Sequence, residues 1–254
     1  MRIQAKKPIK LRGKIIGGEA PLVCIPIVAA EEPELESQAK NIAELCPDII
    51  EWRVDYFKDV CDLKMVKKAL KTIRDIISDI PIIFTFRSSL EGGFLEVKDD
   101  IRFSIIEQII NTGEVDVVDI ELISGKAKIE KIKRTAKTNN VPLILSYHNF
   151  SKTPSVEFML DKIKQQVSNG ANIAKIAVMP ENEEDVLNLL SATLKARKDL
   201  PDIPLITMSM GDLGIISRIA GGIFGSDLTF GACGKTSAPG QIPITELREA
   251  MKPL

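Results

Sequence analysis

Lys175 has the surroundings that point most directly to chemistry, because it lies in an otherwise nearly apolar segment, residues 171–179. Lysine is seldom fully buried without a partner or a role. Burial disfavours the ammonium form, and a neutral amine can form an imine with a ketone or an aldehyde. Two structural interpretations stay open: the ammonium group reaches water past its neighbours, or it is the buried partner of Glu51 or Glu121.

His148 is the single histidine of the chain, and it ends the apolar run before the one that contains Lys175. An imidazole at that position could transfer protons, because its unperturbed pKa lies near neutral pH. It could also be a structural histidine that is hydrogen-bonded beneath a loop. One histidine rules out a His-rich zinc site, and the four cysteines lack metal-ligand spacing, so we expect no metal.

Other polar residues end or follow further apolar runs. Glu51 and Arg53 share one face of a strand, because strand side chains alternate. Arg53 suggests an anionic or hydroxyl-rich ligand, although an ion pair with Glu51 or Asp55 would also explain it. Glu91, in a Glu-Gly-Gly loop, could equally be a solvated carboxylate. The remaining polar candidates are Arg87, Glu121, Arg218, Ser237 and Gln241. Met208 and Met210 could line a pocket or fill the core.

These residues need elements that bring them together, and the chain alternates regularly between two kinds of segment. Apolar runs typical of buried parallel strands span 22–28, 49–54, 82–86, 115–121, 143–147, 173–178, 205–208 and 228–232. Between them, segments 62–77, 99–111, 126–138, 156–168 and 183–198 have helical spacing, with Ser155 as a helix N-cap. Eight strand–helix units in about 250 residues predict a (β/α)₈ TIM barrel, with a doubly wound open sheet as the alternative. Residues 10–16 could add a hairpin that closes the bottom of the barrel, and we expect one domain over residues 1–254.

Composition limits the classes of protein to consider. The chain has 254 residues, of which 44% are hydrophobic and 27% charged, which excludes a mainly disordered protein. A net charge of -1 argues against a nucleic-acid binder with a general basic surface. No apolar run approaches the roughly 20 residues that span a bilayer, and the N-terminus does not resemble a signal peptide. Scattered cysteines fit reduced thiols, so we expect a cytoplasmic protein.

The segment 220–240 contains six glycines. Glycine-rich loops after the last two strands of this fold often bind phosphate. The chain has no P-loop or G-x-G-x-x-G fingerprint, so a nucleotide is not indicated. Residues 237–241 could instead form a mobile lid over a bound substrate.

At these positions the sequence closely resembles the type I 3-dehydroquinate dehydratases, the Schiff-base class of the shikimate pathway. The matching segments follow in order over about residues 17–241, and together they are highly specific. They are DIIEWRVD (48–55), FTFR (84–87), EGG (91–93), LSYHNF (145–150), KTP (152–154), KIAVMP (175–180), ITMSM (206–210), ISR (216–218), FGS (224–226), TFG (229–231) and SAPGQ (237–241).

The resemblance implies a (β/α)₈ barrel that is usually a homodimer and uses no metal or cofactor. It implies dehydration of 3-dehydroquinate to 3-dehydroshikimate by syn elimination. By position, Lys175 matches the lysine that forms an imine with the C3 ketone. His148 matches the residue that removes the C2 proton and assists departure of the C1 hydroxyl. Glu91 matches the carboxylate that orients His148.

The resemblance also implies the residues that hold the substrate. Arg218 matches the main partner of the substrate carboxylate, supported by Ser237 and Gln241. The other matched positions are Glu51, Arg53 and Arg87 around the hydroxyl groups, and Met208 and Phe230 as apolar walls. The residue types agree with this chemistry, since loss of water beside a ketone needs an electron sink, a base and an anchored carboxylate.

One departure from the family pattern and two rival hypotheses accompany this interpretation. The family commonly has Asn-His-Asp where this chain has Tyr147-His148-Asn149, which could alter the pKa or orientation of His148. A different Schiff-base lyase, such as a class I aldolase, could use the same lysine, although no clear phosphate site favours a sugar-phosphate aldolase. A non-catalytic barrel that only binds a hydroxy acid is the third possibility.

Overall fold

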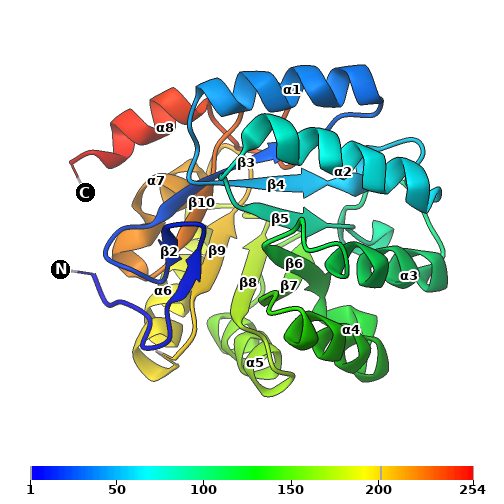
Figure 1. Cartoon of the computed structure of the whole chain (residues 1–254). Helices are drawn as coiled ribbons and strands as arrows, with labels where there is room; N and C mark the ends of the chain where they lie inside the picture. The colour runs from blue at the N-terminus through cyan, green and yellow to red at the C-terminus, as the bar shows by residue number, and fades with distance from the viewer. Residues whose placement is uncertain (1, 201, 254) are drawn as a thin grey trace.

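One sheet of parallel strands forms the centre of the structure (Figure 1). The computed structural model describes residues 2–200 and 202–253, and within them eight strands follow the order β10–β3–β4–β5–β6–β7–β8–β9. Each hydrogen-bonded neighbour pair in this sheet is parallel. The strands are β3 (Leu22–Ile27), β4 (Ile49–Arg53), β5 (Ile82–Thr85), β6 (Val117–Glu121), β7 (Leu143–Asn149), β8 (Ile173–Val178), β9 (Leu205–Ser209) and β10 (Leu228–Phe230).

The first and last strands of this order approach each other through the segment before β10. The amide of Asp227 donates to the carbonyl of Leu205 at 2.7 Å, and the amide of Thr207 donates to Ser226 Oγ at 3.1 Å. Because β10 also pairs with β3, the sheet curls into a nearly closed barrel. The predicted (β/α)₈ TIM barrel is therefore confirmed, and the open-sheet alternative is wrong.

Helices follow the strands and cover the outside of the barrel (Figure 1). Ser155 caps α5 as predicted, because its side chain accepts the amide of Phe158. In the described part of the chain, no helix is long and apolar enough to cross a membrane. The helices are α1 (Glu32–Glu44), α2 (Leu63–Ile77), α3 (Asp99–Ile110), α4 (Lys126–Thr138), α5 (Val156–Ser168), α6 (Glu183–Asp199), α7 (Ile215–Phe224) and α8 (Ile244–Met251).

The predicted hairpin is present and covers the N-terminal end of the barrel. Strands β1 (Ile9–Leu11) and β2 (Lys14–Ile16) pair antiparallel. Their buried side chains Leu11 and Ile16 pack against a ring of apolar residues from the starts of the barrel strands, which includes Ile49, Val117 and Ile173. This end of the barrel is thus closed by apolar packing.

The interior changes character along the strands, with the period of two that strand geometry imposes. Ile49 in the apolar ring is followed on the same face by Glu51, Val117 by Asp119, and Ile173 by Lys175. The same alternation turns the intervening residues outward, where they pack against the helices in a larger apolar cluster. The N-terminal part of the barrel is therefore apolar and the C-terminal part carries the charged groups, which is where barrel enzymes have their active sites.

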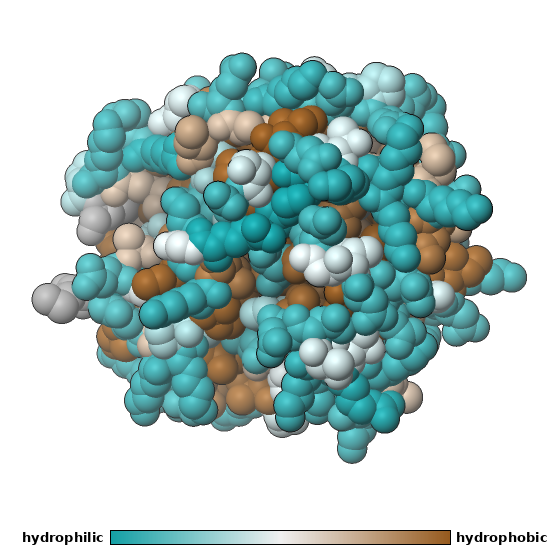
Figure 2. Space-filling view, in the orientation of Figure 1, coloured by the Kyte–Doolittle hydropathy of each residue, from teal (hydrophilic) through white to brown (hydrophobic). Residues whose placement is uncertain are grey.

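One face of the outer surface gives few signs of other binding regions (Figure 2). On the face seen in Figure 2 most residues are hydrophilic, and the hydrophobic ones form separate small areas. Single exposed apolar residues are normal on soluble proteins. The polar interior at the C-terminal end of the barrel is thus the main candidate for a functional site.

Candidate active site

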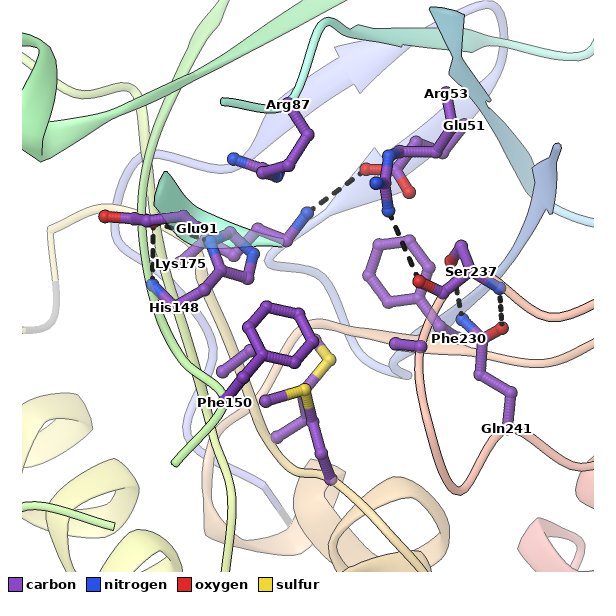
Figure 3. Close-up of a pocket in the computed structure, with 14 residues that line it drawn as sticks. Glu51, Arg53, Arg87, Glu91, His148, Phe150, Lys175, Phe230, Ser237 and Gln241 are labelled. Atoms are coloured by element: carbon purple, nitrogen blue, oxygen red, sulfur yellow. Dashed lines mark hydrogen bonds and ion pairs between the residues drawn. The ribbon is translucent and has the colours of Figure 1, made fainter. Parts of the chain in front are cut away.

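A small cavity opens at the C-terminal end of the barrel, and the predicted site residues converge on it (Figure 3). Its volume is about 30 Å³, room for one or two water molecules, so its own side chains almost fill it. The lining residues are Glu51, Arg53, Arg87, Glu91, His148, Phe150, Lys175, Ala177, Met208, Met210, Phe230, Ser237, Ala238 and Gln241. The predicted site residues outside this set are Arg218, which contacts the sulfur of Met208, and Glu121, which pairs with Arg87.

Lys175 extends from β8 into the barrel, and its side chain is only 4% exposed. Its Nζ donates to Asp119 Oδ2 at 2.8 Å and to Glu51 Oε1 at 3.2 Å. The nitrogen also lies 4.9 Å from the ring centre of Phe230, in cation–π range. The interpretation in which the ammonium reaches water is therefore wrong. Glu51 was predicted correctly as a partner, whereas the other partner is Asp119 and not Glu121.

His148, near the end of β7, is held by Glu91. One oxygen of Glu91, Oε2, lies 2.9 Å from His148 Nδ1 and accepts the backbone amide of the same residue at 2.8 Å. Glu91 is buried, so its interpretation as a solvated loop carboxylate is wrong. Because Oε2 accepts the amide, it acts as an acceptor toward the imidazole as well, which leaves Nε2 free to take a proton.

The electrostatics of this pair favour two uncharged groups at neutral pH. Burial raises the pKa of Glu91 to about 8, and the neighbouring carboxylate of Glu121 adds to this effect. Burial also lowers the pKa of His148 well below its usual value, helped by the positive charges of Arg87 and Lys175. A neutral imidazole in a small cavity is suited to act as a base.

The loop that carries Glu91 is shaped by local interactions. The side chain of Ser88 accepts the amide of Leu90 and caps the short 3₁₀ turn Ser89–Glu91. Gly92 then adopts a left-handed conformation with φ of 83°, and a Cβ at this position would collide with the ring of Phe150. Since Phe150 stacks beside His148, the glycine lets the loop approach the imidazole closely.

Arg87 joins the carboxylates beneath Lys175 into one network. Its guanidinium donates to both oxygens of Asp119 at 3.1 and 3.0 Å, to Glu121 at 2.8 Å and to Ser146 Oγ at 2.7 Å. Burial alone would lower the pKa of Arg87, but Asp119 and Glu121 raise it. Likewise burial would raise the pKa of Asp119, but Arg87 and Lys175 hold it well below its usual value. Both groups are therefore charged at any working pH.

Arg53 and Arg218 differ in how their charges are balanced. Arg53 forms a bidentate ion pair with Asp55, with both distances 2.8 Å, so the predicted ion pair is present with this partner. Arg218 on α7 is buried, and among the described residues no carboxylate forms an ion pair with it. It donates to the carbonyl of Pro239 at 2.8 Å and contacts the sulfur of Met208. Burial accordingly lowers the pKa of Arg218 to about 10.

The segment 237–241 forms one wall of the cavity and covers both arginines. Gln241 Oε1 accepts the amide of Ser237 at 2.9 Å, and its Nε2 donates to Ser237 Oγ at 3.1 Å. The carbonyl of Ser237 lies 3.4 Å from Arg53 Nη1, and Pro239 contacts Arg218. Backbone oxygens of this segment thus lie against both guanidinium groups.

Sequence reasoning missed several residues of the site. Asp119 was not among its candidates, although it holds Arg87 and Lys175 by ion pairs. Phe150 and Ala238, which were also not singled out, complete the cavity wall, whereas Met210 lines it as the sequence suggested. A signal for Asp119 was available, because alternation along the strand at 115–121 places it on the same face as Glu121.

The fold and the site together define a (β/α)₈-barrel enzyme, with a buried lysine and an adjacent histidine at the C-terminal ends of the strands. Comparison with known proteins specifies the family. The model of the type I 3-dehydroquinase family matches residues 23–254. A 3-dehydroquinate dehydratase of Bacillus licheniformis is 44% identical over 246 residues, which cover 97% of each chain.

Solved structures agree with this result. A 3-dehydroquinate dehydratase from Geobacillus kaustophilus superposes with a TM-score of 0.97 at 42% identity, covering 100% of this chain and 98% of that one. A type I enzyme from Clostridium difficile gives a TM-score of 0.93 at 43% identity, covering 97% and 96%. The chain belongs to the type I 3-dehydroquinase family, and it is accordingly a hydro-lyase.

Proposed function

We propose that this chain converts 3-dehydroquinate to 3-dehydroshikimate by syn elimination of water, through an imine on Lys175. The observation that carries the proposal is the burial of Lys175 in one small cavity together with His148. Family membership supports the reaction. The relative from Clostridium difficile was crystallised with covalently modified comenic acid, which is consistent with covalent chemistry in the family.

The reaction begins with the amine of Lys175 attacking the C3 ketone. The carbonyl oxygen leaves as water, and the resulting iminium group draws electrons from the neighbouring carbon. His148 then removes the C2 proton, and the electron pair moves toward the iminium nitrogen. The lowered pKa of His148 suits this step, because the imidazole must be unprotonated to accept the proton.

The same imidazole completes the elimination. Protonated His148 returns its proton to the C1 hydroxyl, which departs as water while the double bond forms between C1 and C2. Water then hydrolyses the conjugated imine and releases 3-dehydroshikimate from Lys175. Glu91 orients the imidazole through its Nδ1 contact. Each step uses side chains of the protein alone, so the proposal includes no metal or cofactor.

Arg218 is the proposed partner of the substrate carboxylate, because its positive charge has no ion-pair partner among the described residues. Glu51, Arg53 and Arg87 would contact the hydroxyl groups, and Met208 and Phe230 would form apolar walls. Ser237 and Gln241 would close over the carboxylate. A cavity of about 30 Å³ is too small for a cyclohexane ring with its substituents, so substrate entry requires segment 237–241 to move.

The proposal also includes the setting in which the enzyme works. We place it as one domain over residues 1–254 in the shikimate pathway, which leads to aromatic amino acids, and in the cytoplasm. We further propose a homodimer. Helix α7 supports this, since Ile216 and Ile223 lie two turns apart on it and are 50% and 53% exposed. Such an apolar stripe suits burial against a second copy.

A turnover assay with product analysis tests the proposal. With 3-dehydroquinate as substrate, we expect the absorbance of an enone to appear and the product to keep every carbon of the substrate. A class I aldolase would instead release fragments from a broken carbon–carbon bond. A non-catalytic barrel would bind the hydroxy acid without any product, and either of these results would refute the proposal.

A further inference from the structure

Asp119 is the charged residue closest to Lys175 Nζ, and the proposed reaction as described gives it no role. It lies on β6 with no exposed surface, and its Oδ2 is 2.8 Å from the lysine nitrogen. The residues lining the cavity include Lys175 and Glu51, whereas Asp119 is outside this set and lies behind the lysine. A substrate in the cavity would therefore meet the front of the nitrogen while Asp119 stays behind it.

The carboxylate of Asp119 is held firmly and stays charged. It accepts hydrogen bonds from Nη1 and Nη2 of Arg87, from the hydroxyl of Ser146 at 2.6 Å and from Nζ of Lys175. Four donors around two oxygens fix its position. Its pKa lies well below the usual range, as described above, so it carries a full negative charge at neutral pH.

Glu51 is the other anion beside Lys175, but its situation differs. Its Oε1 is 3.2 Å from Nζ and also accepts Thr85 Oγ1 at 2.9 Å. It lines the cavity, so a bound substrate can draw its carboxylate away from the lysine. Asp119 is the anion that remains against the nitrogen when the cavity is occupied.

We propose that Asp119 is the counter-ion of the Lys175 nitrogen throughout the reaction, keeping the imine protonated so that it can act as an electron sink. This inference rests on the proposed imine chemistry. The atoms and charges of imine formation balance while the carboxylate of Asp119 stays in place. The ammonium group has three hydrogens. One passes to a base so that the neutral amine can attack the ketone, that proton and a second hydrogen leave with the ketone oxygen as water, and the third stays on the nitrogen. The nitrogen is thus cationic before and after condensation.

The counter-ion matters because the neutral imine is a much weaker electron acceptor than the iminium. When the C2 proton leaves, its electron pair forms the enamine and neutralises the nitrogen. Loss of the C1 hydroxyl then restores the cation in the conjugated iminium. An opposite charge within hydrogen-bond distance commonly shifts an ionisation by one to three pH units. Asp119 would therefore keep the imine protonated into the alkaline range.

The test compares Asp119→Asn with the matched control Glu121→Gln. Both replace a buried carboxylate that binds Arg87, but Glu121 contacts Arg87 and Arg102 and not Lys175. We expect the Asn variant to lose on the order of 100-fold in kcat at pH 8 and less at pH 6. The alkaline limb of its kcat profile should move down by about one pH unit. The Gln control should change KM, and any displacement of its alkaline limb, which would come from the lower pKa of Glu91, should be smaller than in the Asn variant.

Two further variants, one neutral and one that keeps the negative charge, allow the test to be made even if the Asn variant does not fold. Asp119→Ala is a second neutral variant and should show the same displaced limb, whereas Asp119→Glu should keep the wild-type limb even if kcat falls. An unmoved limb in both neutral variants, or an equal displacement in Glu121→Gln, would overturn the counter-ion role. Borohydride trapping of the wild type separates failure of the counter-ion role from failure of the proposed function. If no adduct forms on Lys175, the proposed function itself is wrong.

Discussion

Arg218→Met should stabilise the ligand-free protein while it weakens substrate binding. Burial lowers the pKa of Arg218 to about 10, more than two pH units below its ordinary value. Each pH unit corresponds to about 1.4 kcal/mol, so the unpaired charge destabilises the fold by about 3 kcal/mol. Methionine fills similar space without charge. It leaves the carbonyl of Pro239 without its donor, at a cost of about 1 kcal/mol. The net gain is about 2 kcal/mol.

Thermal denaturation measures this gain directly. For a domain of this size, about 2 kcal/mol raises Tm by roughly 4–8 °C. Because the arginine is charged well past neutral pH in both states, the gain should be the same at every pH below about 9. In the same variant KM for 3-dehydroquinate should rise on the order of 100-fold, since the substrate carboxylate loses a buried charged hydrogen bond.

Arg53→Met is the matched control, because Arg53 is an equally buried arginine that has an ion-pair partner. Its removal leaves Asp55 buried without its counter-charge, and such losses typically cost about 3–5 kcal/mol. We therefore expect opposite shifts in Tm for the two variants. A lower Tm for Arg218→Met, or an unchanged KM, would refute the reasoning that Arg218 holds an unpaired charge for an anionic ligand.

Three further predictions concern the catalytic residues. Lys175→Ala should abolish turnover, measured as enone absorbance; residual activity comparable to that of the wild type would overturn its role. His148→Ala should still form the imine slowly but give little product. Borohydride should therefore still trap an adduct in this variant although its turnover is nearly lost, and full activity would contradict this. Glu91→Gln should increase stability at alkaline pH. Folded protein keeps the Glu91 proton up to about pH 8, whereas the unfolded chain releases it near pH 4.5, so wild-type stability falls as pH rises between these values. The advantage of the Gln variant should grow over this range by a few kcal/mol and then level off; a pH-independent difference in denaturant unfolding would contradict it.

The strands could be predicted from the sequence because each is a nearly continuous apolar run, as strands covered on both faces must be. The prediction at 173–178 coincides with β8, and that at 82–86 extends one residue beyond β5. Helix α1 escaped prediction, since its buried face consists only of Leu35, Ala39 and Ile42 among charged and polar residues.

Helix α7 was indistinct for another reason. It contains two consecutive glycines, which disfavour helix formation when sequence is considered alone. In the structure Gly222 lies against Pro21, and a Cβ there would collide with that ring. The requirement for close packing between distant segments cannot be read from local spacing.

The residues of the site likewise divide into those that local alternation predicts and those that depend on contacts between distant segments. Alternation placed Glu51 and Arg53 on one face, and the resemblance supplied the roles. The choice between Asp119 and Glu121 as partner of Lys175 depended on the tilt of strands in a barrel. By pairing register Glu121 aligns with Ser146 and Ser146 with Lys175, yet the long lysine side chain reaches back to Asp119. The small volume of the cavity depends on side-chain packing and was equally hidden.

The most direct test of the central claim is reduction of the enzyme with borohydride in the presence of 3-dehydroquinate, followed by intact mass and peptide mapping. The account predicts one stable adduct per chain, located on the peptide that contains Lys175 and absent from Lys175→Ala. A folded enzyme that turns over substrate without any adduct, or with the adduct on another lysine, would contradict it.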